Sequence, residues 1–133
     1  MQRWDSLFDK ISQQGYESLT SQERICASVR AMIDATQNGG LISYFYNSGA
    51  DHLDDCRAAL LTLEEPEVLA RLDRVAALFP RESLATLDGR NDVINSWDDD
   101  DESTDELLGQ IDEELYELFD DLEKKLDGLV AAG

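Results

Sequence analysis

Along most of this chain the apolar residues recur every three or four positions, which is the spacing of one face of an α-helix. The first such stripe consists of Trp4, Leu7, Phe8 and Ile11. Gly15 is placed to end this helix. A second helix begins at a capping box of Thr20 and Glu23, in which each side chain can bond the other residue's backbone N–H. Its buried stripe is predicted to be Ile25, Val29, Met32 and Ile33.

The middle of the chain continues the helical pattern in shorter pieces. Residues 38–40, Asn-Gly-Gly, end the second helix, because glycine accepts the left-handed backbone that helix ends commonly need. Residues 41–46 have strand propensity, yet their place between two helices predicts a helical turn. Asp51 is predicted to cap a fourth helix. A fifth helix is predicted to start at Pro66, where the missing N–H of proline is harmless.

The last third of the chain has a different character. Residues 89–102 lack periodicity and contain four consecutive aspartates, so they are predicted to form an exposed acidic loop. Residues 103–131 are predicted to form a long, acidic, amphipathic C-terminal helix that opens with a capping box of Ser103 and Glu106. Its apolar stripe would be Leu108, Ile111, Leu115, Leu118, Leu122 and Leu129. The whole pattern predicts an all-α fold, with residues 1–133 forming a single compact domain of about six helices.

Charge separates the last third from the rest. The chain has 11 basic and 30 acidic residues, a net charge of -19. Residues 1–91 carry 14 acids and 9 bases, net -5, whereas residues 92–133 carry 16 acids and 2 bases, net -14. Such a surface repels nucleic acid and anionic lipid and attracts basic proteins, with a strong dependence on salt.

Several classes of protein find no support in the composition. No apolar run is long enough to cross a bilayer, and no secretory signal is visible in residues 1–20, so we expect a cytoplasmic protein without membrane contact. The two cysteines, Cys26 and Cys56, form no CxxC motif, and we expect both to be buried.

The sequence offers little for catalysis or for a cofactor. The aspartate run lacks the spacing of a helix-loop-helix calcium site, and His52 is the only histidine. We therefore expect no enzymatic activity, no metal and no cofactor. An enzyme or metal site that uses Glu23, Asp51 and His52 is a weaker alternative.

The acids of the C-terminal helix are arranged in a way that stability does not favour. Glu113 with Glu117, and Glu117 with Asp121, are like-charged i, i+4 pairs, each of which opposes the helix by a few tenths of a kcal/mol. Carboxylates one turn apart lie about 5.4 Å from each other along the axis. Duplex DNA likewise presents regular rows of phosphates, which proteins grip with Lys and Arg. The residues predicted to imitate phosphates are Asp98, Asp99, Asp100, Asp101, Glu102, Glu106, Glu113, Glu117, Asp120 and Asp121.

Three segments together resemble a bacterial family of DNA-mimic proteins. They are residues 19–24 with Leu19 and Glu23-Arg24, residues 38–49, NGGLISYFYNSG, and residues 115–122, LYELFDDL. The resemblance spans most of the chain. It implies an all-helical fold, no known enzymatic activity and, for the characterised type, an acidic surface that occupies the DNA-binding face of a transcription factor. The motif at 38–48 is expected to build the fold, and mimicry to depend on surface acids.

These observations favour a DNA mimic that binds a basic DNA-binding protein, either a transcriptional regulator or a nucleoid protein, and competes with DNA. An immunity-type inhibitor of a basic toxin or nuclease would use the same charge. An acidic helical domain with a different role is a third hypothesis. We expect no direct binding of nucleic acid, and the sequence leaves open whether the chain forms a homodimer.

Overall fold

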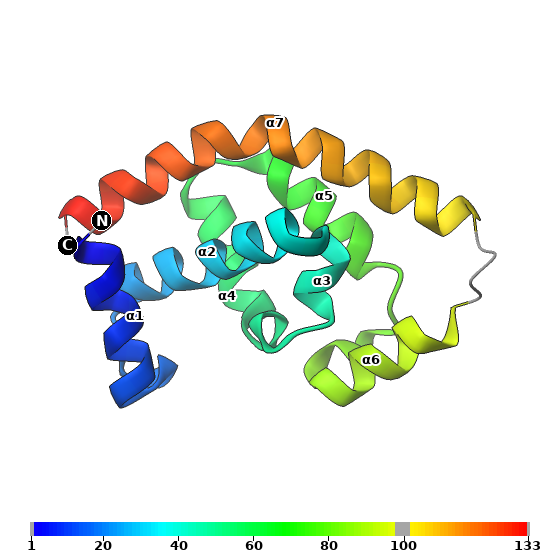
Figure 1. Ribbon diagram of the computed structural model, residues 1–133, viewed down its shortest axis with the longest axis horizontal. Helices are drawn as coiled ribbons and strands as arrows, with labels where there is room; N and C mark the ends of the chain where they lie inside the picture. Colours follow the sequence, from blue (N-terminus) through cyan, green and yellow to red (C-terminus); the bar gives the residue numbers. More distant parts are fainter. Residues whose placement is uncertain (1, 98–101, 133) are drawn as a thin grey trace.

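The computed structural model describes residues 2–97 and 102–132, and this part of the chain is all-α, as predicted (Figure 1). Its seven α-helices and three short 3₁₀ helices are α1 (Gln2–Gln14), η1 (Tyr16–Ser18), α2 (Ser21–Gly39), α3 (Leu41–Phe45), η2 (Ser48–His52), α4 (Leu53–Thr62), α5 (Pro66–Ala76), η3 (Arg81–Ala85), α6 (Leu87–Ser96) and α7 (Glu102–Ala132).

The longest helix, α7, arches over one side of the molecule and spans its length (Figure 1). It passes across α2 and α5, and its C-terminal end returns to α1, so that the two termini lie at the same end. Its concave side carries five side chains that are 0–1% exposed, namely Ile111, Leu115, Phe119, Leu122 and Leu126. Phe119 and Leu126 replace Leu108, Leu118 and Leu129 of the predicted stripe, because those three are only partly buried.

Most local predictions for the first half of the chain are confirmed. Thr20 and Glu23 form the capping box, with Glu23 N donating to Thr20 Oγ1 at 3.2 Å and Thr20 N donating to Glu23 Oε1 at 2.8 Å. Residues 41–46 do form a helical turn, since α3 covers Leu41–Phe45. α5 begins at Pro66, and both Cys26 and Cys56 are buried.

The predicted acidic loop at 89–102 is wrong over most of its described length. Residues 87–96 form α6, which Thr86 caps by accepting a hydrogen bond from Gly89 N at 3.0 Å. The helical spacing of apolar residues is not apparent in this segment, because the most buried position of α6 holds a charged residue, Arg90, which is 0% exposed. At the end of the segment, Glu102 already belongs to α7. The prediction for residues 98–101 lies outside the described residues.

Two predicted helix caps are also wrong. Asp51 lies within η2 and caps no helix; its Oδ1 instead accepts a hydrogen bond from Arg90 Nη2 at 2.8 Å. Ser103 lies inside α7, so it is not the N-cap of a box with Glu106. In the first case the Asp51 carboxylate forms an ion pair with a residue far away in the sequence. Local sequence patterns do not predict such a contact.

Arg90 connects the irregular middle of the chain to α6. Besides the ion pair with Asp51, its guanidinium donates to three backbone carbonyl oxygens, those of Phe45 at 2.9 Å, Leu84 at 2.8 Å and Asn47 at 3.1 Å. A buried cation is costly unless it is paired and hydrogen-bonded, and here it is both. The arginine thus holds the ends of α3, η2 and η3 in one arrangement.

We predict that Arg90→Ala lowers the free energy of unfolding by about 3–5 kcal/mol, because it leaves three carbonyls and a carboxylate without their donor. Urea unfolding followed by circular dichroism measures the change. Arg74→Ala is the control: Arg74 is exposed and, among the described residues, has no ion pair, so its loss should shift the value by about 0.5 kcal/mol or less. Equal effects of the two substitutions would contradict this role of Arg90.

Candidate functional site

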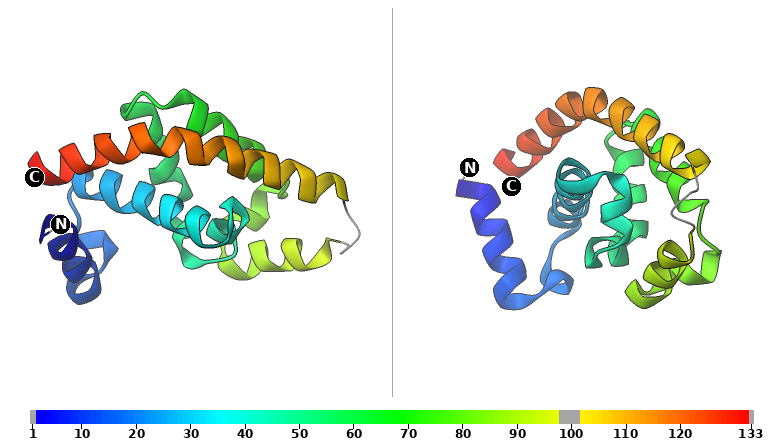
Figure 2. Two further views of the ribbon diagram at one scale, coloured as in Figure 1. Left: turned by 45° about the horizontal axis from the view of Figure 1, so that its top comes forward. Right: turned by 45° about the vertical axis from the view of Figure 1, so that its right-hand side comes forward.

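The outer face of α7 carries the predicted phosphate-mimicking acids that the structure describes. These six side chains are all exposed: Glu102, Glu106, Glu113, Glu117, Asp120 and Asp121. Figure 2, in its left view, turns this side of α7 toward the viewer, and none of the other described helices crosses it. The remaining four predicted residues, Asp98, Asp99, Asp100 and Asp101, lie outside the described residues.

Five of these acids form a narrow stripe, which we name the acidic ridge: Glu102, Glu106, Glu113, Glu117 and Asp120. At 100° per residue they fall within about 60° of one another around the helix axis. At 1.5 Å per residue the ridge is about 27 Å long. Asp121 lies about 40° beyond its edge and is partly neutralised by Lys125, whose Nζ is 3.5 Å from Asp121 Oδ2.

The ridge is not neutralised by the protein's own bases. Within residues 2–97 and 102–132 no lysine or arginine forms an ion pair with any of its five carboxylates. Like charges one turn apart repel. Among the described residues of α7, the one base in the same stripe is Lys124, one turn beyond Asp120, and it forms no ion pair with a ridge carboxylate. The ridge is therefore a free, concentrated negative surface on a continuous helix.

Other acids of α7 instead have partners within the fold. Glu114 pairs with Arg71 at 3.1 Å, Glu123 pairs with Arg30 at 3.7 Å, and Asp127 accepts from Trp4 Nε1 at 2.9 Å. Glu114 and Glu123 lie on the two flanks of α7, and the three contacts connect this helix to α5, α2 and α1 respectively. Residue spacing along α7 gives no sign of the bond between Asp127 and Trp4.

Asp112 joins α7 to the start of α3. Its Oδ1 accepts a hydrogen bond from Leu41 N at 2.8 Å. Burial raises the pKa of this carboxyl above its usual value, and the bond from Leu41 N opposes that rise. Gly40 makes the contact possible, because its φ is +83° and a Cβ there would lie 2.5 Å from Asp112 Oδ2.

Lys125 joins the far end of α7 to the turn between α4 and α5. Its Nζ donates to Leu63 O at 2.7 Å and lies 3.1 Å from Oε1 of the buried Glu65. Burial raises the pKa of Glu65, and neighbouring Asp121 adds to that rise while Lys125 opposes it. Together with the Asp112 contact, this ion pair holds α7 at two points about 20 Å apart along its axis, given 13 residues at 1.5 Å each.

The residues of the alternative enzyme site are engaged in three separate structural contacts. Glu23 belongs to the capping box and accepts from Lys10 Nζ at 2.8 Å, and these hydrogen bonds lower its pKa. Asp51 pairs with Arg90, and the ring of His52 stacks on that of Tyr16 with centroids 3.6 Å apart. Among the described residues, no group of three or more His, Cys, Asp or Glu side chains is placed to hold a metal ion.

None of the described helices has the length and apolar content needed to cross a membrane.

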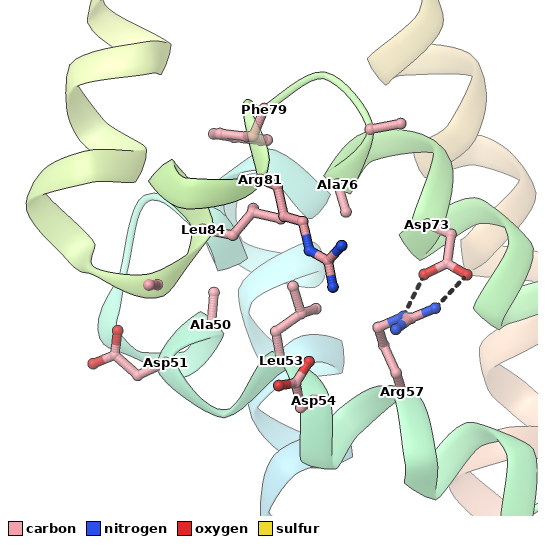
Figure 3. Close-up of a pocket in the computed structure, with 12 residues that line it drawn as sticks. Ala50, Asp51, Leu53, Asp54, Arg57, Asp73, Ala76, Phe79, Arg81 and Leu84 are labelled. Atoms are coloured by element: carbon pink, nitrogen blue, oxygen red, sulfur yellow. Dashed lines mark hydrogen bonds and ion pairs between the residues drawn. The ribbon is translucent and has the colours of Figure 1, made fainter.

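A separate hollow lies between α4, α5 and η3, away from the ridge (Figure 3). Its volume is about 830 Å³, and its wall combines apolar side chains such as Leu53 and Phe79 with the charged residues Arg57, Asp73 and Arg81. The sequence gives no sign of this hollow, because its residues come from η2, α4, α5, η3 and the segment between α5 and η3 and share no local pattern.

Comparison with known families gives one match. The model of the DMP19-like protein family matches residues 17–132. This chain belongs to the DMP19-like protein family. The resemblance read from the sequence is thereby confirmed, and α1 precedes the matched region. A search of curated proteins and a search of solved structures found no match.

In this DMP19-like chain the motif at residues 38–49 has a structural role. Gly40 supplies the positive φ and the space for Asp112, while Tyr44 and Phe45 are 0% exposed in the core. The carbonyl of Asn47 accepts from Arg90. The motif therefore fixes the turn between α2 and η2, and the acidic ridge lies on a different part of the molecule.

We predict that Gly40→Ala lowers the free energy of unfolding by about 1–3 kcal/mol, since a side chain is strained at this φ and also displaces Asp112. Gly109→Ala is a matched control inside α7, where a Cβ has no neighbour within 4 Å. That change should stabilise the protein by about 0.5–1 kcal/mol through helix propensity. Thermal and urea unfolding measure both; a neutral Gly40→Ala would contradict the packing of Asp112 against this glycine.

Proposed function

We propose that this DMP19-like protein is a DNA mimic, whose acidic ridge occupies the DNA-binding surface of a basic transcriptional regulator or nucleoid protein and thereby excludes DNA. The observation that carries the proposal is the row of five exposed carboxylates on α7, with which no described base forms an ion pair. Membership of the DMP19-like family fits the same role.

The dimensions of the ridge suit this role. Its length of about 27 Å corresponds to about eight base-pair steps of duplex DNA at 3.4 Å each. Glu113 and Glu117 are about 6 Å apart along the axis, a spacing that a pair of phosphate-binding Lys or Arg side chains can span. Because α7 is one continuous helix from Glu102, these distances are set before a partner binds, which reduces the ordering cost of association.

The charge of the whole molecule favours encounter with a basic partner. A net charge of -19 produces a long-range field that accelerates association with cations and depends steeply on ionic strength. The ridge then supplies the local contacts that decide which basic surface is bound. The long-range field therefore affects the association rate, and the ridge geometry affects the affinity.

We predict that replacing Glu106, Glu113 and Glu117 together by glutamine weakens binding to a partner captured from cell extract at low salt by about tenfold or more. Helical content should stay unchanged and stability should hold or rise, because glutamine keeps helix propensity and removes like-charge repulsion. Binding is measured by titration at several salt concentrations, and competition by the release of the partner from its DNA in a gel-shift assay.

A control with the same change in net charge separates ridge geometry from total charge. Asp9, Glu82 and Asp92 are exposed, lie off α7 and have no ion pair among the described residues. Changing them to Asn, Gln and Asn should leave affinity within about twofold at physiological salt, where the Debye length is about 8 Å. Equal losses in the two triple variants would refute a specific ridge. A captured nuclease that is inhibited without DNA competition would instead support an immunity-type inhibitor.

A further inference from the structure

The hollow between α4, α5 and η3 brings two guanidinium groups to one place in a protein with a large excess of acids. Arg57 and Arg81 both line it, and Figure 3 shows the Arg81 side chain reaching from η3 across the open middle of the hollow. Of the 11 lysines and arginines in the chain, nine precede residue 92, and the hollow contains two of these. This part of the surface is therefore much less negative than α7.

The two arginines differ in whether a carboxylate of the protein pairs with their charge. Arg57 pairs with Asp73 through two bonds, Nε to Oδ1 at 2.6 Å and Nη2 to Oδ2 at 3.2 Å, so both carboxylate oxygens are engaged. The Arg81 side chain has no hydrogen bond or ion pair to any other described residue. Asp51 also lines the hollow, but its carboxylate pairs with the buried Arg90. The charge of Arg81 is thus free to act on a ligand, next to an Arg57 that Asp73 holds in place.

Apolar side chains form the wall beneath these charged groups. Leu53 and Phe79 line the hollow while being only 8% and 5% exposed, so each presents a small part of its surface to it. Ala50, Ala76 and Leu84 extend the same wall. The volume of about 830 Å³ lies in the range of small-molecule sites, which combine an apolar lining with a few polar groups that fix the ligand's orientation.

We propose that this hollow binds a small organic carboxylate, with its apolar body against Leu53 and Phe79 and its carboxylate paired with Arg81. The planar guanidinium fork matches a carboxylate through two parallel hydrogen bonds. Asp54 lines the hollow as well and has no ion pair among the described residues, so it repels a second negative charge. A singly charged carboxylate is therefore favoured over a phosphate, which carries about 1.5 to 2 negative charges at neutral pH.

This site is separate from the acidic ridge, since all its lining residues lie between Ala50 and Ala85 and none belongs to α7. Ligand binding in the hollow does not depend on the DNA-mimic proposal. An experiment that refutes one of the two proposals does not refute the other.

The test is a titration of ¹⁵N-labelled full-length protein with hexanoate at constant ionic strength, followed by amide NMR shifts. Hexanoate should produce saturable shifts confined to residues 50–57 and 73–85. Arg81→Gln should weaken binding by about tenfold or more, because charge-assisted hydrogen bonds are lost. Arg74→Gln removes the same charge from a nearby exposed residue of α5 that does not line the hollow, so it should leave affinity within about twofold.

Two further probes distinguish the features of the ligand. Hexanamide keeps the apolar body without the charge, and inorganic phosphate carries charge without an apolar body; both should bind at least about tenfold more weakly than hexanoate. The proposal is overturned by the absence of saturable hexanoate shifts, by equal binding of hexanoate and hexanamide, or by equal effects of the two arginine substitutions. Because Arg81 is exposed, its variant should retain the wild-type amide spectrum outside the hollow, which confirms that the fold is unchanged.

Discussion

The packing of the apolar side of α7 against the rest of the molecule is the constraint on which the acidic surface depends. Five side chains of this helix are 0–1% exposed, and burying each such side chain contributes about 1.5–3 kcal/mol. A like-charged pair one turn apart opposes the helix by only a few tenths of a kcal/mol. Burial therefore exceeds the repulsion between neighbouring carboxylates by an order of magnitude, and the helix can carry a ridge of uncompensated acids without losing its structure.

The acids of α7 divide according to where they lie around the helix axis. Those on the flanks, such as Glu114 and Glu123, have partners on α5 and α2 and help to attach the helix. Those on the outer side, such as Glu113 and Glu117, have no basic partner among the described residues. One helix thus combines structural carboxylates with carboxylates available to another molecule, and it is the attachment by the first group that gives the second a fixed geometry.

Three polar side chains organise the parts of the chain that apolar packing leaves irregular. Arg90 donates hydrogen bonds to backbone carbonyls next to η2. Asp112 accepts a hydrogen bond from the backbone N–H that begins α3, and Lys125 donates one to a backbone carbonyl in the turn after α4. Each is partly or fully withdrawn from solvent and bonds to backbone groups 40 or more positions away, except for the bond from Arg90 to Leu84. Such contacts supply hydrogen bonds to backbone groups that the short helices leave unsatisfied.

The sequence by itself determined the helical class, the capping box at Thr20, the start of α5 at Pro66 and the concentration of acids on one face of α7, because all of these follow from local spacing and local backbone chemistry. Tertiary structure decided the rest. It made residues 87–96 a helix with Arg90 buried, paired Asp51 with that arginine, and assembled a hollow from η2, α4, α5 and η3. It also selected which acids stay free, since that depends on which bases the fold brings within reach, and spacing along the chain carries no information about those distances.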